Sequence, residues 1–344
     1  MLCIRTGMSA LATAAAALAV CGAPAARAQQ LKGAGATFPA PIYQKWFFEY
    51  NKTHRNVSFD YQPVGSGGGV AQYKAGTVDF GATDAPLSDA ERASIPWPTL
   101  HIPTVVGAEV LAYNLPGIAN GLKLSGDVIA DIYLGKIQRW NDRRIAAQNP
   151  GVRLPALPIT VVHRSDGSGT TYIFTNYLSS VSREWATRVG TGKSVNWPLG
   201  LGGNGNSGVA GLVRHSPGAI GYVELAYAIT TRLTYGPVRN RAGRYVDATI
   251  ASTTEAANSA LSRMAKDVRV SIVDGPGANA YPIAGFTYLL VSRTPRDTAK
   301  ARALIEFLRW AMGPGQKMAA GLLYAPLPPS VVKLNERAMS TIRL

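Results

Sequence analysis

A short run of residues between Arg164 and Thr170 carries side chains suited to hold an anion. Its sequence, Arg-Ser-Asp-Gly-Ser-Gly-Thr, places one guanidinium near the hydroxyls of Ser168 and Thr170, with Gly169 between them. A guanidinium offers a planar, permanently charged pair of donors that fits two oxygens of an oxyanion. Asp166 could hold the guanidinium in place, although an ordinary surface ion pair or a helix N-cap at Asp166 would use the same residues. The run favours an oxyanion site, with these alternatives open.

Three more glycine-rich segments carry related chemistry: Gly33–Pro39, Gly65–Gly69 and Gly202–Asn206. The first two, like Asp166–Thr170, contain Ser or Thr and lead into a helix-like pattern. A helix N-terminus offers unpaired backbone N–H groups and the positive end of the helix dipole, and glycine lets that backbone approach a ligand closely. Three such loops in one chain predict an oxyanion site built from several loops.

Asp84, within the segment Val78–Asp89, would give such a site its selectivity. A buried carboxylate repels an anion unless the anion has a proton to donate. Phosphate near neutral pH keeps one or two O–H groups and sulfate keeps none, so a carboxylate acceptor admits phosphate and penalises sulfate by several kcal/mol. This interpretation requires Asp84 to face the ligand, whereas a turn or N-cap position would explain the same aspartate.

Motifs for other chemistry are incomplete in this sequence. Gly65–Gly69 lacks the Gly-Lys-Ser/Thr of a P-loop, and Gly33–Gly35 lacks the third glycine of a dinucleotide fingerprint. The four histidines are too dispersed for a metal motif, and the two cysteines, Cys3 and Cys21, lie near the N-terminus, so we expect no metal and no cofactor. Ser168 does not lie in a G-x-S-x-G elbow. A secreted hydrolase that uses Ser168 stays open as the alternative to a binding protein without catalytic residues.

Strands and helices that alternate along the chain would position these loops. The candidate strands are Val57–Pro63, Thr104–Tyr113, Ile159–His163, Ile220–Val223 and Thr287–Ser292. The candidate helices are Pro41–Asn51, Gly69–Ala75, Val128–Leu134, Thr170–Ser180 and Pro295–Met312. This alternation predicts an α/β fold. In the last helix, Leu304, Phe307, Leu308 and Ala311 recur at helical spacing, so one face should pack inward, and Gly313–Gly315 should end the helix.

The N-terminus has the pattern of a secretory leader, residues 1–28. Arg5 precedes the uncharged stretch Met8–Val20, and Ala26–Ala28 has the small-x-small pattern of a cleavage site. The apolar stretch is shorter than the roughly 20 residues that span a bilayer. We expect cleavage after Ala28 and export to the periplasm, with lipidation of Cys21 as the alternative.

The chain carries a formal net charge of +15, and loss of the leader, which holds two arginines and no acid, would leave +13. Such an excess raises the question of nucleic-acid binding. The basic residues are scattered, however, and the densest group consists of Arg232, Arg239, Arg241 and Arg244. A cationic surface that concentrates anions is therefore favoured, and we expect no nucleic-acid partner.

Eight segments in a fixed order connect the chain to a known family. They are GAGATFPAP (Gly33–Pro41), VGSGGGV (Val64–Val70), VDFGATDAPLSD (Val78–Asp89), DIYLGKIQRWND (Asp131–Asp142), RSDGSGT (Arg164–Thr170), NWPLGLGGNGN (Asn196–Asn206), PGAIGYVE (Pro217–Glu224) and YAPLPPSVV (Tyr324–Val332). The chain resembles the periplasmic phosphate-binding protein of the bacterial high-affinity phosphate ABC transporter over essentially all residues after the leader. Gly67 departs from the family pattern, which often has a second serine there.

The resemblance implies a two-lobed periplasmic-binding-protein fold of type II, with phosphate in the central cleft and a hinge of two chain crossings. One lobe would be residues 29–112 and 284–344, and the other residues 113–283. The protein would be a monomer that is not an enzyme and that delivers inorganic phosphate to membrane permease subunits. A receptor for another tetrahedral oxyanion, such as arsenate, sulfate or molybdate, is the alternative within this class.

The resemblance also implies a role for each site residue. Thr37 and Phe38 would bind phosphate through a hydroxyl and backbone N–H groups, and Ser66 through its hydroxyl and backbone. Asp84 would accept the phosphate proton. Arg164 would make the charged contact, oriented by Asp166. The remaining donors would be Ser168, Gly169 and Thr170.

Overall fold

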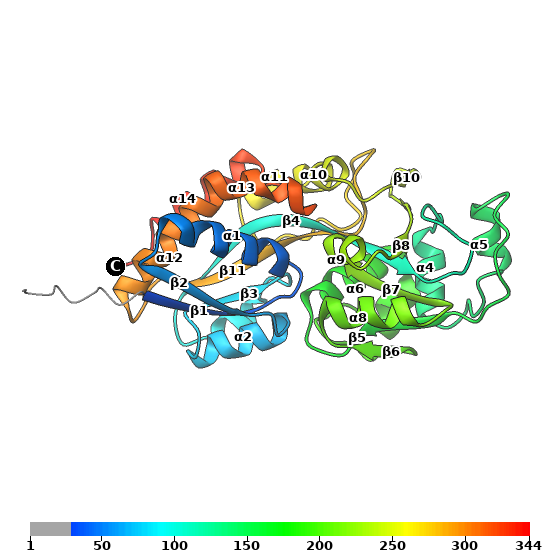
Figure 1. Ribbon diagram of the computed structural model, residues 1–344, viewed down its shortest axis with the longest axis horizontal. Coiled ribbons are helices and arrows are strands. Elements are labelled where there is room, and N and C mark those ends of the chain that lie inside the picture. The colour runs from blue at the N-terminus through cyan, green and yellow to red at the C-terminus, as the bar shows by residue number, and fades with distance from the viewer. Residues whose placement is uncertain (1–28) are drawn as a thin grey trace, which may run out of the picture.

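A computed structural model describes residues 29–344, and in it strands and helices alternate along most of the chain (Figure 1). The strands are β1 (Gln29–Gly35), β2 (Val57–Gln62), β3 (Phe80–Thr83), β4 (Thr99–Tyr113), β5 (Thr160–Arg164), β6 (Leu201–Gly203), β7 (Ala219–Glu224), β8 (Thr234–Tyr235), β9 (Val238–Arg239), β10 (Tyr245–Val246) and β11 (Ala284–Ser292). The α-helices are α1 (Ala40–Thr53), α2 (Ser66–Ala75), α3 (Asp89–Ala93), α4 (Gly126–Tyr133), α5 (Arg143–Gln148), α6 (Gly169–Val181), α7 (Arg183–Arg188), α8 (Gly205–His215), α9 (Leu225–Thr230), α10 (Ile250–Asn258), α11 (Leu261–Met264), α12 (Thr298–Trp310), α13 (Gln316–Ala319) and α14 (Pro329–Met339). The predicted leader, its cleavage site and Cys21 lie outside the described residues.

One sheet path, β2-β1-β3-β11-β4-β7-β5-β6, runs through both halves of the molecule. In the first half β1 is parallel to β2 and β3, and β11 is antiparallel to β3 and β4. In the second half β7 is antiparallel to β4 and parallel to β5, which is parallel to β6. Figure 1 shows the two groups of elements, with β4 reaching from the first toward the second. The predicted two-lobed α/β fold is confirmed.

Strand β4 belongs to both lobes because it changes its partner partway along. Its residues up to Ala108 pair with β11, and those from Glu109 onward pair with β7. After β10 the chain forms α10, which packs against β4 and β11, and α11, which contacts α14. The residue bounds of the two lobes, 29–112 with 284–344 and 113–283, stay a prediction.

Pro103 interrupts the apolar pattern of β4. The predicted strand therefore started at Thr104, whereas β4 starts at Thr99. Pro103 pairs with Tyr288 of β11, and the register then passes over Thr104 to pair Val105 with Thr287. Proline has no N–H for a ladder hydrogen bond and is tolerated in a sheet at such an irregularity. The strand therefore continues back to Thr99.

Helix α12 packs as predicted but does not end as predicted. Leu304, Phe307 and Leu308 are buried, as expected from their spacing. The Gly-Pro-Gly run, however, does not end the helix, because a π-helical turn at Ala311–Gly315 leads directly into α13. The wider turn accommodates a proline that lacks an N–H. The indole Nε1 of Trp46 donates to the Gly315 carbonyl at 2.8 Å and so gives one carbonyl of this turn a partner outside the helix. Across residues 29–344, no helix has the length and hydropathy of a membrane span.

Candidate anion-binding site

Four glycine-rich loops each follow a parallel strand and precede a helix. They connect β1 to α1, β2 to α2, β5 to α6 and β6 to α8. The carboxyl ends of parallel strands lie at one edge of a sheet, where ligands bind in open α/β folds. The first two loops belong to one lobe and the last two to the other. The fourth loop, which was not predicted to lead into a helix, does so as well, because α8 begins at Gly205.

Loops from the two lobes touch each other. The Gly67 N–H donates to the Gly167 carbonyl at 2.7 Å. A Cβ built on Gly169 would lie 2.4 Å from Asp84 Oδ2 and 2.5 Å from Ser66 Oγ, so only glycine fits this position. A Cβ on Gly67 would lie 3.0 Å from the Gly167 Cα, so a serine there would press on the facing loop. Glycine at position 67 thus permits the close approach of the two lobes.

Asp84 is buried without hydrogen-bond partners for its carboxylate. It is 3% exposed, and among residues 29–344 neither Oδ1 nor Oδ2 has a partner. Its backbone N–H donates to Ser66 Oγ at 3.2 Å. Burial raises the pKa of Asp84 to about 7, an effect that the nearby Thr287 hydroxyl and the charge of Arg164 partly oppose. Asp84 caps no helix, so the structure excludes the N-cap interpretation and presents the carboxylate as an acceptor in need of a donor.

Arg164, which is buried, and Asp166, which is partly buried, form a two-pronged ion pair. Nε of Arg164 donates to Oδ1 of Asp166 at 2.7 Å and NH2 donates to Oδ2 at 2.5 Å. The Arg164 side chain is 1% exposed, which excludes an ordinary surface pair. Although burial opposes ionisation, the guanidinium and the Gly205 N–H hold the pKa of Asp166 below its ordinary value. The N-cap of α6 is Ser168, so the N-cap interpretation of Asp166 is wrong.

The hydroxyl groups predicted for the site keep protons that they can donate. Ser66 Oγ accepts from the Asp84 N–H, and Ser168 Oγ accepts from the Thr171 N–H at 3.0 Å. Neither oxygen donates to another described residue, so each hydroxyl proton is available. Thr170 Oγ1 accepts from NH1 of Arg164 at 3.1 Å. All of these side chains are buried.

Backbone donors lie at the same edge of the sheet. Phe38 precedes α1 and is buried, and its carbonyl accepts from the Tyr324 hydroxyl at 2.7 Å. The carbonyl of Thr37 accepts from the Tyr227 hydroxyl at 2.6 Å. Gly169 begins α6, so its N–H and that of Thr170 have no intrahelical acceptor. The tyrosines cover the carbonyl groups, which leaves N–H groups as the backbone's contribution.

Three buried polar residues at the site were missed by the sequence analysis. Asn206, in the first turn of α8, donates Nδ2 to Thr37 Oγ1 at 2.8 Å and to Thr170 Oγ1 at 3.1 Å. Glu109 and Glu224 face each other across β4 and β7 and are fully buried. Burial raises the pKa of both well above the ordinary value, and the nearby Asp84 adds to the effect, so the neutral form of each is favoured. The Gly-Asn-Gly-Asn run was the available signal for Asn206, whereas nothing in the sequence marks the two glutamates.

Groups that would support catalysis or metal binding do not gather around Ser168. In the described part of the chain, Ser168 Oγ bonds only to a backbone N–H, and His163 stacks on Trp197 with 4.8 Å between ring centroids. No cluster of three or more His, Cys, Asp or Glu side chains within residues 29–344 is arranged to hold a metal ion. The hydrolase alternative gains no support from this geometry.

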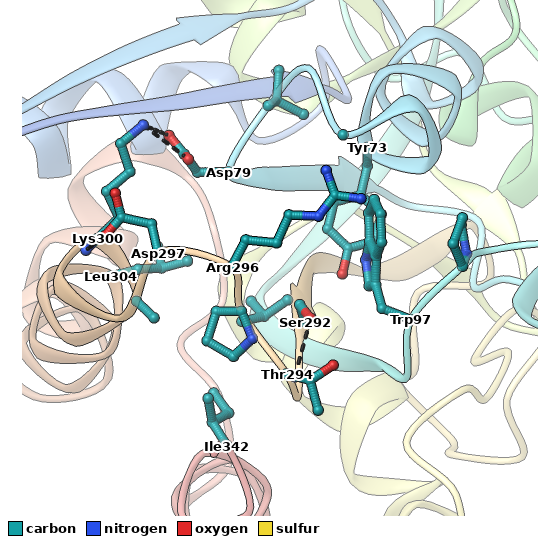
Figure 2. Close-up of a pocket in the computed structure, with 16 residues that line it drawn as sticks. Tyr73, Asp79, Trp97, Ser292, Thr294, Arg296, Asp297, Lys300, Leu304 and Ile342 are labelled. Atoms are coloured by element: carbon teal, nitrogen blue, oxygen red, sulfur yellow. Dashed lines mark hydrogen bonds and ion pairs between the residues drawn. The ribbon is translucent and has the colours of Figure 1, made fainter. Parts of the chain in front are cut away.

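A separate cavity of about 420 Å³ lies between α2, β11 and α12 and is shown in Figure 2. Its cationic side chains are engaged by neighbours. Lys300 Nζ lies 3.0 Å from both carboxylate oxygens of Asp79, and the Arg296 guanidinium lies 5.3 Å from the centroid of the Trp97 ring. None of the predicted site residues lines this cavity, so it is distinct from the anion-binding site.

Comparisons with known proteins identify relatives and a shared fold. The model of the PBP superfamily domain matches residues 22–314. A phosphate-binding protein PstS from Xylella fastidiosa is 44% identical over 310 residues, which cover 89% of this chain and 84% of the relative.

Two solved structures have the same fold at low sequence identity. A high-affinity periplasmic phosphate-binding protein, PfluDING, bound with phosphate, superposes with a TM-score of 0.69 at 22% identity and covers 90% of this chain and 93% of its own. An ABC-type phosphate transport receptor from Vibrio cholerae superposes with a TM-score of 0.55 at 18% identity and covers 87% of this chain and 100% of its own. At these identities the superpositions establish the fold alone.

Proposed function

The chain belongs to the PBP superfamily and, within it, to the PstS phosphate-binding proteins, and from this premise we propose that it is an exported receptor that captures inorganic phosphate between its lobes and delivers it to an ABC importer. Its relatives are named for phosphate binding, and none of those cited is named as an enzyme. Binding without turnover also suits the buried site, whose polar groups, apart from the Asp84 carboxylate, are donors fixed in place.

The buried, unpartnered carboxylate of Asp84 is the single observation that supports phosphate as the ligand. Its carboxylate is buried within a site that otherwise presents donors, and both oxygens lack a partner among the described residues. A phosphate O–H would donate to this carboxylate, while the remaining phosphate oxygens accept from the surrounding groups. A fully deprotonated tetrahedral anion would set its lone pairs against the carboxylate and lose affinity.

The other site residues supply donors from both lobes. Thr37, Phe38 and Ser66 contribute hydroxyl and backbone groups from the first lobe. From the second lobe, Arg164 contributes the guanidinium, which Asp166 fixes and whose charge it partly offsets. Hydroxyl and backbone N–H groups of Ser168, Gly169 and Thr170 complete the set. Contacts from both lobes would stabilise the closed form, which is the form a permease would recognise.

The cellular context of the protein is part of the same proposal. We infer cleavage of the leader after Ala28 and release into the periplasm, where the monomeric receptor would dock on membrane permease subunits. The hinge would consist of the crossing near Leu111–Asn114 and the return near Pro282–Gly285, between lobes with the bounds predicted from the sequence.

Calorimetric titration tests the function directly. The protein from residue 29 onward, stripped of bound phosphate, is titrated with phosphate, arsenate, sulfate and molybdate in turn. We expect tight one-to-one binding of phosphate that an excess of sulfate or molybdate does not weaken. Tighter binding of sulfate or molybdate than of phosphate would refute phosphate as the ligand, and turnover of a chromogenic phosphate ester would refute a role without catalysis.

A further inference from the structure

Asn206 connects the two lobes at the site and determines how two of its hydroxyls behave. We propose that Asn206 is a positioning residue that forces the hydroxyls of Thr37 and Thr170 to act only as donors, so that a protonated oxygen of the ligand can face Asp84 but not these threonines. This inference rests on the proposed function and adds to it the orientation of the bound anion.

Thr37 Oγ1 is occupied as an acceptor on both of its lone pairs. Asn206 donates to it twice, from Nδ2 at 2.8 Å and from its backbone N–H at 3.3 Å. A hydroxyl oxygen has two acceptor lone pairs and one proton. Within the described residues no acceptor takes that proton, so it remains free to point at a ligand.

Thr170 Oγ1 is occupied in the same way from two different residues. Asn206 Nδ2 donates to it at 3.1 Å, and NH1 of Arg164 donates at 3.1 Å. Its hydroxyl proton again has no acceptor among residues 29–344. One carboxamide therefore sets the direction of two hydroxyls, one from each lobe, because Thr37 follows β1 while Thr170 lies in the first turn of α6.

The orientation of the Asn206 carboxamide is fixed by its third contact. Oδ1 accepts from the backbone N–H of Glu224 at 2.9 Å, so the opposite group that faces the threonines must be the NH₂. Asn206 is fully buried, and Glu224 belongs to a strand held in the sheet by β4 and β5. The donor character of both threonines is thus imposed by the fold of the second lobe.

This arrangement leaves few places for a proton on the ligand. An O–H of the anion that faced Thr37 or Thr170 would meet a donor with both lone pairs engaged. Asp84, with two unpartnered oxygens, is the acceptor to which a proton of the anion can turn. Every proton of the bound anion should therefore face Asp84, and none should face Thr37 or Thr170.

The variant Asn206→Ala tests the proposal through its dependence on pH. Each threonine would keep one of its two present donors and could rotate to accept a proton. We expect phosphate affinity to fall about tenfold on the alkaline side of neutrality, where the anion is dibasic, because two fixed donors are lost. On the acid side the loss should be smaller, since the freed hydroxyls can accept the second proton. Titration of Asp84 affects both proteins, so it cancels when the affinity ratio of wild type to variant is compared across pH.

Asn204→Ala is the matched control. Asn204 lies two residues earlier, at the N-cap position of α8, is exposed, and makes no capping hydrogen bond through its side chain, so phosphate affinity should not change. Asn206→Asp retains the size of the side chain and the oxygen that accepts from the Glu224 N–H. It replaces the alanine variant in the test if loss of that hydrogen bond unfolds the alanine variant. Its second oxygen would draw both threonine protons toward itself, so we expect a larger loss than for alanine.

A double-mutant cycle separates positioning from a merely structural role. In the background Thr37→Val, Thr170→Val, the Asn206→Ala change should cost little further affinity, because the hydroxyls through which it acts are gone. Two results would overturn the positioning role if the wild type binds phosphate: an affinity loss in Asn206→Ala that is equal at all pH values, or a loss that adds fully to that of the valine changes. Either result would leave the receptor function intact. Failure of the wild type to bind phosphate would overturn both.

Discussion

Replacing the buried carboxylate by its amide, Asp84→Asn, should change anion discrimination more than any other single exchange of similar size. The side chain is 3% exposed and both of its oxygens lack partners among residues 29–344, so the carboxylate can accept a proton from the ligand. A hydrogen bond to a charged group contributes about 1.5–3 kcal/mol, and a buried unpaired polar group costs about 1–3 kcal/mol. The amide replaces the charged acceptor by a neutral one, so it loses much of the first contribution with phosphate, and its NH₂ can donate to sulfate and remove the second cost.

These magnitudes translate into affinities. At about 1.4 kcal/mol per factor of ten, phosphate binding should weaken roughly ten- to hundredfold and sulfate binding should strengthen by a similar factor. Competition calorimetry on the stripped variant measures both constants. Asp89→Asn is the control, because it removes the same charge from the same segment at a side chain that is 88% exposed. If Asp84→Asn discriminates between the two anions as the wild type does, Asp84 does not contact the ligand and the reasoning fails.

Three further predictions concern closure, charge and pH. Gly169→Ala should weaken phosphate binding about tenfold or more, because the Cβ of the alanine would overlap Asp84 Oδ2. Small-angle X-ray scattering of this variant with phosphate should show lobes that remain open. Unchanged affinity would contradict the close contact at Gly169. Arg164→Lys should weaken phosphate binding, measured by calorimetry, about tenfold or more, because an ammonium cannot keep both the two-pronged bond to Asp166 and the bond to Thr170. An unchanged dissociation constant would mean that Arg164 contributes only its charge. In ligand-free protein, the raised pKa of Asp84, about 7, means that stability present at acid pH is lost as the pH rises from about 4 through about 7. Asp84→Asn should not show this loss, so its unfolding midpoint relative to wild type should rise over that window, and parallel curves would contradict the shift.

The local chemistry of the site could be predicted because it depends on neighbours in sequence. Glycine and a hydroxyl residue at a strand end, followed by a helix, are encoded within a few residues, as at Ser66 and Ser168. The pairing of Arg164 with Asp166 is encoded in the same way. The role of Asn206 could not be predicted, because its contact with Thr37 joins residues that are 169 positions apart and exists only after the lobes meet.

Where tertiary contacts compete with local preference, the sequence was a poorer guide. The glycines around Pro314 indicate a helix end, yet the chain continues through a π-helical turn whose Gly315 carbonyl has a partner in Trp46. The facing positions of Glu109 and Glu224 follow from the register of β4 with β7, which the residue types do not reveal. Two buried acids side by side contradict the usual expectation for charged residues, so no pattern of hydropathy would have paired them.

A crystal structure of the phosphate complex would test the central claim most directly. We predict one anion between the lobes, with one oxygen within hydrogen-bonding distance of the Asp84 carboxylate and others in contact with Arg164 and the hydroxyls of Thr37 and Thr170. A phosphate bound elsewhere, for example in the cavity beside Trp97, or one bound between the lobes without contact to Asp84, would contradict the account.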